Sequence, residues 1–401
     1  MNDNKYTESE NKDLKDIVYD RIRKKGRITF AEYMDLVLYH PIQGYYNSPK
    51  EIFGKDGDYY TSPYIHPVFG HLIAGLIHKM WNALDKRQDF TIVEAGAGKG
   101  FLCCDILNRM REKFPDFYES SVYKIIEINR QNIVSQKELL KRHAHEYKVR
   151  WHCSDDLKDG RVQFNGCYIS NELIDSFPFN RVKMVEGKLS ESYVILNRNR
   201  LNEELGGLST NRLAQYFENL DITLKEGQRA EVNLRVFDWM EEINRAMEQG
   251  FIITIDYGYK ADELFAPFRK DGTLTCYYRH TVNHDPYIRV GLQDITAHVD
   301  FSTLMATGEK MGLKITAYLE QYRFLIALGL LSVLDEIEKN RQTMSTAQYY
   351  KEKLSMKNFL VPGGMGVLFK VLIQFKGVED NRGSVLRVKK MELKDNLTLF
   401  Y

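Results

Sequence analysis

The chain has 401 residues, of which 43% are hydrophobic and 28% charged. This composition is typical of a folded globular protein and excludes a largely disordered chain. Its 56 lysines and arginines nearly balance its 55 aspartates and glutamates, so net charge gives no reason to expect global attraction to nucleic acid or to an anionic membrane.

The N-terminal sequence is polar and contains acids, without the apolar core of a signal peptide or the arginine-rich character of a presequence. We therefore expect a cytoplasmic protein. The longest apolar run, residues 324–334, is shorter than the roughly 20 residues that a membrane helix needs, so we expect no membrane insertion and interpret the run as buried core. The cysteines and histidines show no CxxC or HxxxH pattern, and no metal site is predicted.

The first 89 residues predict an N-terminal helical region that also contains a loop. A helix over 14–26 ends at Gly26, and a second begins at Thr29, with Glu32 at capping-box spacing. Residues 41–67 form a loop rich in proline and tyrosine, and apolar residues at helical spacing follow from 68 to 81.

From residue 90 onward, short apolar runs alternate with helical patterns, which predicts an α/β fold with a mostly parallel sheet covered by helices on both faces. We expect a core over 90–297 with a hairpin-like insertion at about 181–230. A helical insertion over 298–360 and closing strands with the C-terminal tail over 361–401 complete the prediction. The predicted strands are 90–95, 122–128, 148–153, 166–170, 251–257 and 367–376, and the predicted helices between the first of them are 100–113 and 131–147.

The sequence VEAGAGKG at 93–100 places Gly96, Gly98 and Gly100 directly after the first predicted strand. In a parallel sheet this is where a glycine-rich turn leads into a helix and binds a ligand. A P-loop requires Ser or Thr at position 100, and the dinucleotide fingerprint requires Gly or Ala where the chain has Phe101. Both nucleotide classes therefore fit poorly.

An acid at the end of the first strand, Glu94, favours a ligand with positive charge and no phosphate. S-adenosylmethionine has a sulfonium, an α-amine and no phosphate, so we predict it as the cofactor. Glu127, at the end of the second strand, could accept hydrogen bonds from both ribose hydroxyls. Asp155 and Asp156 follow the third strand and could accept the hydrogen bond of the adenine amino group.

An ordered series of further motifs resembles the MidA-like methyltransferase family. The resemblance covers about residues 20–376 and implies a Rossmann-like seven-strand methyltransferase core with added helical parts. For the mitochondrial members of the family it also implies methylation of arginine in a protein subunit. Tyr64 and His71 stand where the family commonly has acids. The motifs are ITFAEYM, HPIQGYY, KDGDYYTSPYIHPVFG, VEAGAGKG, SNELIDSFPFNRV, ITIDYG, DITAHVDF and PGGMGVLFKVL.

The segment SNELIDSFP at 170–178 leaves the fourth strand and is our candidate for the catalytic segment, with Asn171, Glu172 and Asp175 near the transferred methyl group. Alternatively, Asn171 and Glu172 cap a following helix. An arginine acceptor needs carboxylates that fix its guanidinium group. Further candidates for binding the substrate are Asp256, Tyr257, Asp294 and Asp300.

The loop segment GDYYTSP at 57–63 suggests a lid over the cofactor, with Asp58, Thr61 and Ser62 reaching it; a structural turn packed on the sheet edge is the alternative. We therefore expect an S-adenosylmethionine-dependent methyltransferase that acts on a protein side chain, with arginine favoured, and that could form a homodimer. A small-molecule methyltransferase and a cofactor-binding assembly factor without turnover are the rivals. Nucleic-acid methylation fits less well, because SNEL replaces the usual Pro-Pro-aromatic motif and the chain is neutral.

Overall fold

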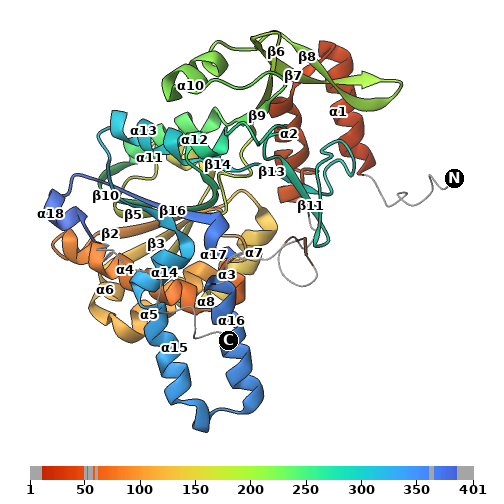
Figure 1. The fold of residues 1–401 in the computed structure, drawn as a ribbon. Helices are drawn as coiled ribbons and strands as arrows, with labels where there is room; N and C mark the ends of the chain where they lie inside the picture. The colour runs from red at the N-terminus through yellow and green to blue at the C-terminus, as the bar shows by residue number, and fades with distance from the viewer. Residues whose placement is uncertain (1–10, 49–51, 53–56, 59–61, 361–364, 386–401) are drawn as a thin grey trace.

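A central sheet of mostly parallel strands forms the core of the computed structural model, which describes residues 11–48, 52, 57–58, 62–360 and 365–385 (Figure 1). Its strand order is β15-β16-β10-β5-β2-β3-β4, with the short β14 beside β10. The five strands from β10 to β4 are parallel, and β16 runs antiparallel between β10 and β15. The seven-strand α/β core is confirmed. The bounds are β2 Phe90–Ala95, β3 Ser121–Ile126, β4 Val149–His152, β5 Phe164–Asn171, β10 Met247–Tyr259, β14 Val299–Asp300, β15 Lys314–Glu320 and β16 Phe369–Lys376.

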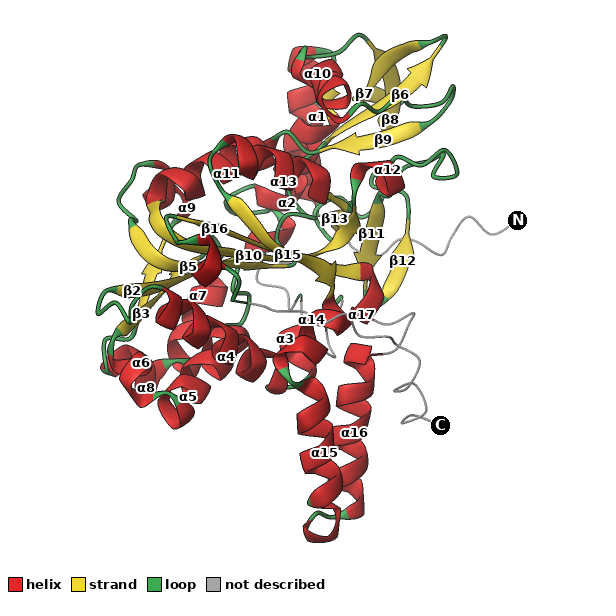
Figure 2. Cartoon of the chain, turned by 60° about the vertical axis from the view of Figure 1, so that its left-hand side comes forward, coloured by secondary structure: helices red, strands yellow, loops and turns green. Residues whose placement is uncertain are grey.

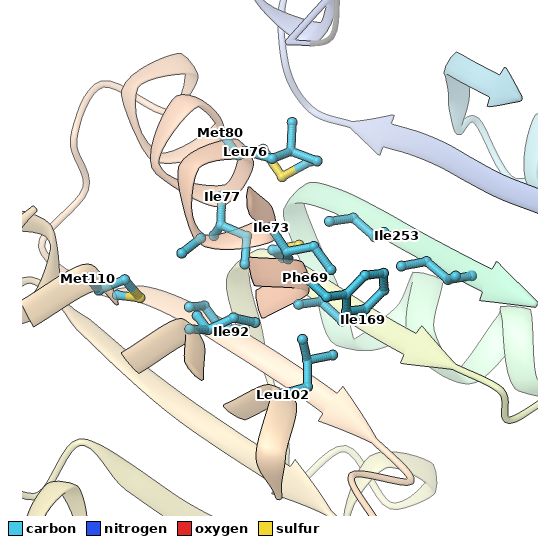
Figure 3. Packing of buried hydrophobic residues seen from close by; sticks show 14 of the residues in the cluster. Phe69, Ile73, Leu76, Ile77, Met80, Ile92, Leu102, Met110, Ile169 and Ile253 are labelled. Carbon is cyan, nitrogen blue, oxygen red and sulfur yellow. The ribbon is translucent and has the colours of Figure 1, made fainter. Parts of the chain in front are cut away.

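Helices cover both faces of this sheet, because successive strand residues point to opposite faces (Figure 2). On one face Ile92, Ile169 and Ile253, from three neighbouring strands, lie against Phe69 and Ile73 of helix α4 (Figure 3). The helices that contribute buried residues to this face are α4 Val68–Ala83, α5 Phe101–Lys113, α6 Pro115–Glu119, α14 Gln321–Leu328, α15 Leu330–Lys339 and α16 Thr346–Leu360. Those of the other face are α9 Ser154–Lys158, α11 Arg235–Ala246 and α13 Phe301–Lys310.

A second, smaller layer is built from segments far apart in the sequence. Strands β1, β7, β6 and β9 form a sheet in that order with β8 beside β7, and the N-terminal helices α1 and α2 pack on it (Figure 1). The expected hairpin-like insertion is therefore present, and it also contains a helix, α10. The bounds are α1 Lys12–Lys25, β1 Ile28–Thr29, α2 Phe30–Tyr39, β6 Asn180–Val185, β7 Lys188–Asn197, β8 Arg200–Gly206, α10 Arg212–Leu220 and β9 Arg229–Val232.

The N-terminal region that we proposed over 1–89 is thus divided between two layers. Helices α1 and α2 belong with the inserted sheet, whereas α4 covers the core. Gly26 follows α1 with φ of 80°, and Thr29 Oγ1 accepts from the Glu32 N–H at 3.1 Å, as predicted. The Glu32 carboxylate instead accepts from Arg21 and Lys25, so only half of the expected capping box forms.

We expected a helical insertion over 298–360, but this segment is not purely helical. It contains β15, which pairs with β16 and completes the core sheet. Gly329, at φ of 108°, divides the apolar run 324–334 between α14 and α15, and α15 and α16 form a hairpin that projects from the core (Figure 2). The run is only partly buried core, because Phe324, Leu325 and Leu330 are buried but the residues between them are half-buried.

The remaining elements lie along the chain between those already described. A three-stranded sheet in the order β12-β11-β13 lies next to α2. The bounds are η1 Tyr45–Asn47, α3 Ser62–Ile65, α7 Arg130–Leu139, α8 Lys141–His145, α12 Ala261–Leu264, β11 Thr275–Tyr278, β12 Thr281–Asn283, β13 Asp294–Thr296, η2 Arg341–Thr343, α17 Met365–Leu368 and α18 Asp380–Gly383.

Candidate active site

The glycine loop connects β2 to α5 at the carboxyl end of the sheet. Gly96, Gly98 and Gly100 all have positive φ, of 69°, 53° and 85°, a conformation that strongly favours glycine. A Cβ at Gly96 would also lie only 2.9 Å from Leu173 Cδ1. Gly96 and Gly98 line a pocket, whereas Gly100 is buried at the start of α5 and supports the loop from behind.

Glu94 lies in the wall of this pocket, with only 3% of its surface exposed. The Tyr123 hydroxyl donates to Glu94 Oε2 at 2.6 Å. Burial raises the pKa of Glu94 to about 7, against the lowering effect of the Tyr123 hydrogen bond, and nearby Glu127 raises it further. A cationic ligand group beside Glu94 would favour its charged form.

Glu127 follows β3 and lines the same pocket. Its Oε1 accepts from the backbone N–H groups of Ile128 and Asn129, both at 2.9 Å, and its Oε2 accepts from Gln136 Nε2 at 3.0 Å. Burial raises the pKa of Glu127, and these hydrogen bonds oppose the shift. The carboxylate is therefore held in one orientation, with acceptor capacity left on Oε2.

Gln136 is a site residue that sequence reasoning missed. It is fully buried, and its Nε2 also donates to the Gly98 carbonyl at 2.7 Å, while its Oε1 accepts from Trp151 Nε1 at 2.9 Å. Gln136 thus joins the glycine loop to Glu127. Its signal in the sequence is a polar residue at an inward-facing position of α7, four residues before the buried Leu140.

The pocket has a volume of about 110 Å³ and opens into a groove of about 1050 Å³. Three carboxylates line it, from Glu94, Glu127 and Glu172, and its described lining includes neither lysine nor arginine. This set of charges suits a ligand with cationic groups and hydroxyls, and it disfavours a phosphate. The described residues therefore fit S-adenosylmethionine, whose sulfonium and α-amine are positive.

The turn after β5 brings two of the three predicted catalytic residues to the pocket, Asn171 and Glu172. Asn171 Nδ2 donates to Glu172 Oε1 at 3.0 Å, and the Ser62 N–H donates to the same oxygen at 3.4 Å. Burial raises the pKa of Glu172 to about 8, and neighbouring Asp175 adds to the shift. Residues 172–179 are all described and contain no helix, so the interpretation of Asn171 and Glu172 as helix caps was wrong.

Asp175, the third predicted catalytic residue, faces away from this pocket. It lines a separate cavity of about 20 Å³ together with His298 and Asp300, which is room for one or two water molecules. Burial raises the pKa of Asp175 well above its usual range, and Asp256 raises it further. The Tyr257 hydroxyl hydrogen-bonds to Asp175.

Asp256 has a structural role and not the substrate-binding role that we predicted. Its Oδ2 accepts from three successive backbone N–H groups of the turn, at Leu173, Ile174 and Asp175, at 3.2, 2.9 and 3.4 Å. Its Oδ1 accepts from the Tyr257 N–H at 2.9 Å. Asp256 therefore fixes the turn that positions Asn171 and Glu172.

The other predicted substrate residues also lie outside the pocket lining. Asp294 Oδ1 accepts from the Tyr46 hydroxyl at 2.6 Å, and Asp300 caps α13 through the Ser302 N–H at 2.9 Å. The ring of Tyr257 packs edge-on against His298 and Phe369. The side chains of Asp294, Asp300 and Tyr257 are therefore engaged in contacts with other parts of the protein.

Of the described residues in the segment 57–63 that we expected to form a lid, only Pro63 lines the pocket. Asp58 is buried and accepts from the Tyr45 hydroxyl at 2.7 Å and the Arg279 N–H at 2.6 Å, so it anchors the loop and does not reach the cofactor pocket. Thr61 lies outside the described residues. The Ser62 hydroxyl hydrogen-bonds to Gln321. The loop residues that line the pocket are Tyr46, Ile52, Pro63 and Tyr64.

Asp155 and Asp156 do not line the pocket, which corrects their assignment to adenine. Asp156 accepts from the Cys153 N–H at 3.0 Å and from Arg161 Nε at 2.6 Å, as part of the cap of α9. The Arg161 hydrogen bond holds the pKa of Asp156 at about 2. The Asp155 side chain is 68% exposed beside Lys158. Of this segment, Ser154 and Leu157 line the adjoining groove.

Sequence reasoning also missed the polar rim of the pocket. Tyr39, from α2, hydrogen-bonds through its hydroxyl to the Ser176 hydroxyl at 2.9 Å, and both residues line the pocket. Asn129 caps α7 by accepting from the N–H groups of Gln131 and Asn132. The tyrosine-rich HPIQGYY motif next to Tyr39 was the available signal.

The sheet order, the glycine loop and the acidic pocket together are typical of a Rossmann-like methyltransferase. The model of a family of S-adenosyl-L-methionine-dependent methyltransferases matches residues 72–319, and the chain belongs to this family. It is therefore an S-adenosylmethionine-dependent methyltransferase, and S-adenosylmethionine is its cofactor, as predicted.

Known relatives extend over most of the chain. A Burkholderia thailandensis protein described as a methyl transferase, solved bound to S-adenosyl-homocysteine, is 27% identical with a TM-score of 0.81, and the match covers 92% of this chain and 93% of that one. The Drosophila melanogaster mitochondrial protein arginine methyltransferase NDUFAF7 homolog is 26% identical over 89% of this chain and 84% of its own. Human mitochondrial NDUFAF7, also a protein arginine methyltransferase, is 29% identical over 79% of this chain and 73% of its own.

The described part of the chain contains no group of three or more His, Cys, Asp or Glu residues that could hold a metal ion. None of its helices is both long enough and apolar enough to cross a membrane.

Proposed function

We propose that the chain transfers the methyl group of S-adenosylmethionine to an arginine side chain of a protein. The observation that carries this proposal is the charge of the pocket, whose described lining holds three carboxylates and no lysine or arginine. Glu94 and Glu127 suit the cationic methionine end and the ribose of the cofactor. Glu172 remains for a cationic acceptor.

A guanidinium group suits the position of Glu172. Arginine is planar, always charged and able to donate two parallel hydrogen bonds to a carboxylate. Burial raises the pKa of Glu172 to about 8, so an arriving guanidinium would restore its charged form and gain the ion pair. Glu172 would then orient the acceptor nitrogen and distribute the positive charge of the guanidinium group unevenly. The bound cofactor would supply the methyl group from its sulfonium.

The site residues that we propose follow from this placement. Glu94, Gly96, Gly98 and Glu127 bind the cofactor, and Gly100 supports their loop. Asn171 and Glu172 contact the acceptor, because both line the pocket beside the cofactor position. The animal relatives named as protein arginine methyltransferases support the choice of acceptor.

A small-molecule acceptor is the remaining alternative, and the groove beside the pocket argues against it. An enclosed cavity would favour a metabolite, whereas the groove opens widely and has a volume of about 1050 Å³. Two features argue against an assembly factor without turnover: Asn171 and Glu172 are both positioned in the pocket, and Asp256 is used to hold their turn.

The test is Glu172→Gln, which keeps the size of the side chain and removes its charge. We expect labelled methyl transfer into protein to fall at least about 100-fold, the scale of a lost charged interaction, with S-adenosylmethionine affinity within about twofold of the wild type. Calorimetry measures the affinity, and acid hydrolysis with chromatography identifies the methylated amino acid. Methyllysine, or a small labelled product, would overturn the arginine assignment.

We keep the cytoplasmic location as a proposal. The animal relatives are named mitochondrial and do not support it. Cell fractionation with an antibody to the chain decides between the two compartments. A homodimer is likewise a proposal, and sedimentation velocity at several concentrations checks it.

A further inference from the structure

A groove continues from the cofactor pocket, and five residues line both cavities: Tyr39, Gly96, Glu127, Ile128 and Leu173. Sites for whole small ligands have volumes of about 300–1,000 Å³, and the groove alone has about 1050 Å³. The pocket, at about 110 Å³, is smaller than such a site, so the adenosyl half of the cofactor would extend into the groove beside Glu127 and Ser154. Ile42, Phe177 and Pro178 line the groove but not the pocket.

The part of the groove far from Glu127 has an aromatic floor. Trp239 of α11 lies edge-on to Tyr168 at 5.8 Å and to Phe177 at 6.1 Å between ring centroids. Trp239 Nε1 donates to the Tyr168 hydroxyl at 3.2 Å, so the polar ends of these two side chains are satisfied by each other. Trp239 and Tyr168 are only 3% and 1% exposed, so they support the base of the groove from within the core. The half-buried Phe177 and Pro178 are the neighbouring residues that present apolar surface to it.

At the mouth of the groove, two aliphatic side chains are exposed to solvent. Ile42 is 73% exposed and Ile128 is 42% exposed, and both line the groove. Aromatic residues and exposed aliphatic residues at one site are typical of a surface that binds another protein. Arg130, Lys158 and Asp35 lie around them and give the polar rim of such a surface.

One turn separates the groove from the candidate catalytic residues. Asn171 and Glu172 face the pocket, Leu173 lines both cavities, and Phe177 and Pro178 face the groove. A chain lying along the groove would therefore pass within a few residues of Glu172, which favours a polypeptide acceptor as the occupant.

We propose that the part of the groove formed by Ile42, Phe177 and Pro178 binds the acceptor polypeptide next to its target residue. An apolar side chain of the acceptor packs on Ile42 and Phe177, while the target arginine reaches Glu172. This rests on the proposed function, since it places the segment that flanks the methylated side chain.

The test compares Ile42→Asp with Val282→Asp. Val282 is also an exposed aliphatic residue, at 59%, and lies on β12 outside both cavities. The probe is a lysate of host cells that lack the gene, incubated with labelled S-adenosylmethionine. We expect Ile42→Asp to reduce labelling of the main acceptor protein at least tenfold, with S-adenosylmethionine affinity and melting temperature unchanged, and Val282→Asp to behave as the wild type.

A second readout uses the acceptor itself. Mass spectrometry of the labelled protein gives the methylated site, and two synthetic peptides are then compared, one native and one with serine in place of the apolar residues within four positions of the site. We expect the serine peptide to raise KM at least tenfold for the wild type and by less than threefold for Ile42→Asp.

Three outcomes would count against the proposal in distinguishable ways. Equal labelling by Ile42→Asp and Val282→Asp would overturn the groove assignment and leave the proposed function standing. Normal labelling by Ile42→Asp together with loss of self-association in sedimentation would show that the groove is a contact between copies of the chain. No protein labelling by the wild type, despite cofactor binding, would overturn the proposed function and this inference with it.

Discussion

Glu127 and Asp155 are acids of the same predicted site with opposite surroundings. Glu127 is 6% exposed and faces the pocket, while Asp155 is exposed on α9. We expect Glu127→Ala to weaken S-adenosylmethionine binding by about 1.5–3 kcal/mol, the scale for losing a charged hydrogen-bond acceptor. Asp155→Ala is the matched control and should leave affinity unchanged. Calorimetric titration measures both, and equal losses would contradict the assignment of Glu127.

The residues that could be predicted are those whose place depends only on strand order. Glu94, Glu127 and the glycines follow predicted strands, and the carboxyl ends of parallel strands meet at one edge of the sheet. Asp58, Asp156 and Asp256 were assigned wrongly because a sequence does not tell which donors a carboxylate meets. All three accept backbone N–H groups, from Arg279, Cys153 and the turn after β5.

At the scale of elements, the turn after β5 depends on a single side chain of β10. Asp256→Ala would leave the N–H groups of Leu173, Ile174 and Asp175 without their acceptor in a buried position. We expect a loss of about 2–4 kcal/mol in the free energy of unfolding, since each unsatisfied buried donor costs about 1–3 kcal/mol. Methyl transfer should fall as well, because Asn171 and Glu172 lose their support.

Urea denaturation measures this change, with Asp238→Ala as the control. Asp238 lies on α11, and its side chain is 55% exposed. A stability of Asp256→Ala within about 0.5 kcal/mol of the control would mean that the turn is held by other contacts.

Strand β15 shows why part of the fold was not predicted. Only Ala317 among its residues is buried, because β15 lies at the edge of the sheet. Without a run of buried apolar residues, Lys314–Glu320 gives no strong strand pattern and was included in a helical insertion. The central strands β2, β5 and β10 are buried on both faces and were predicted from their continuous apolar runs.

For the whole molecule, buried carboxyl groups predict how stability changes with pH. Burial raises the pKa of Glu94 and Asp256 to about 7 and that of Glu172 to about 8. Between pH 6.5 and 8 the folded chain therefore holds protons that the unfolded chain has already released. The free energy of unfolding should fall as pH rises through this window.

Urea denaturation at pH 6.5, 7, 7.5 and 8 checks the direction. The window starts at pH 6.5 because burial lowers the pKa of His298 to about 4. This histidine therefore makes stability rise with pH only up to the pKa of an unfolded histidine, about 6.5. Glu172→Gln should give a shallower slope than the wild type. A flat or rising wild-type profile would contradict the raised pKa values.

The position of β16 has a consequence for how the chain folds during synthesis. Residues 369–376 pair with β10 on one side and β15 on the other, so the ribosome must make this last strand of the sheet before the sheet closes. Until then β10 exposes a long strand edge, which is buried in the finished fold and can pair with another unfinished chain. Newly made molecules should therefore depend on chaperones until β16 is made, and slow synthesis just before β16 would favour aggregation over folding.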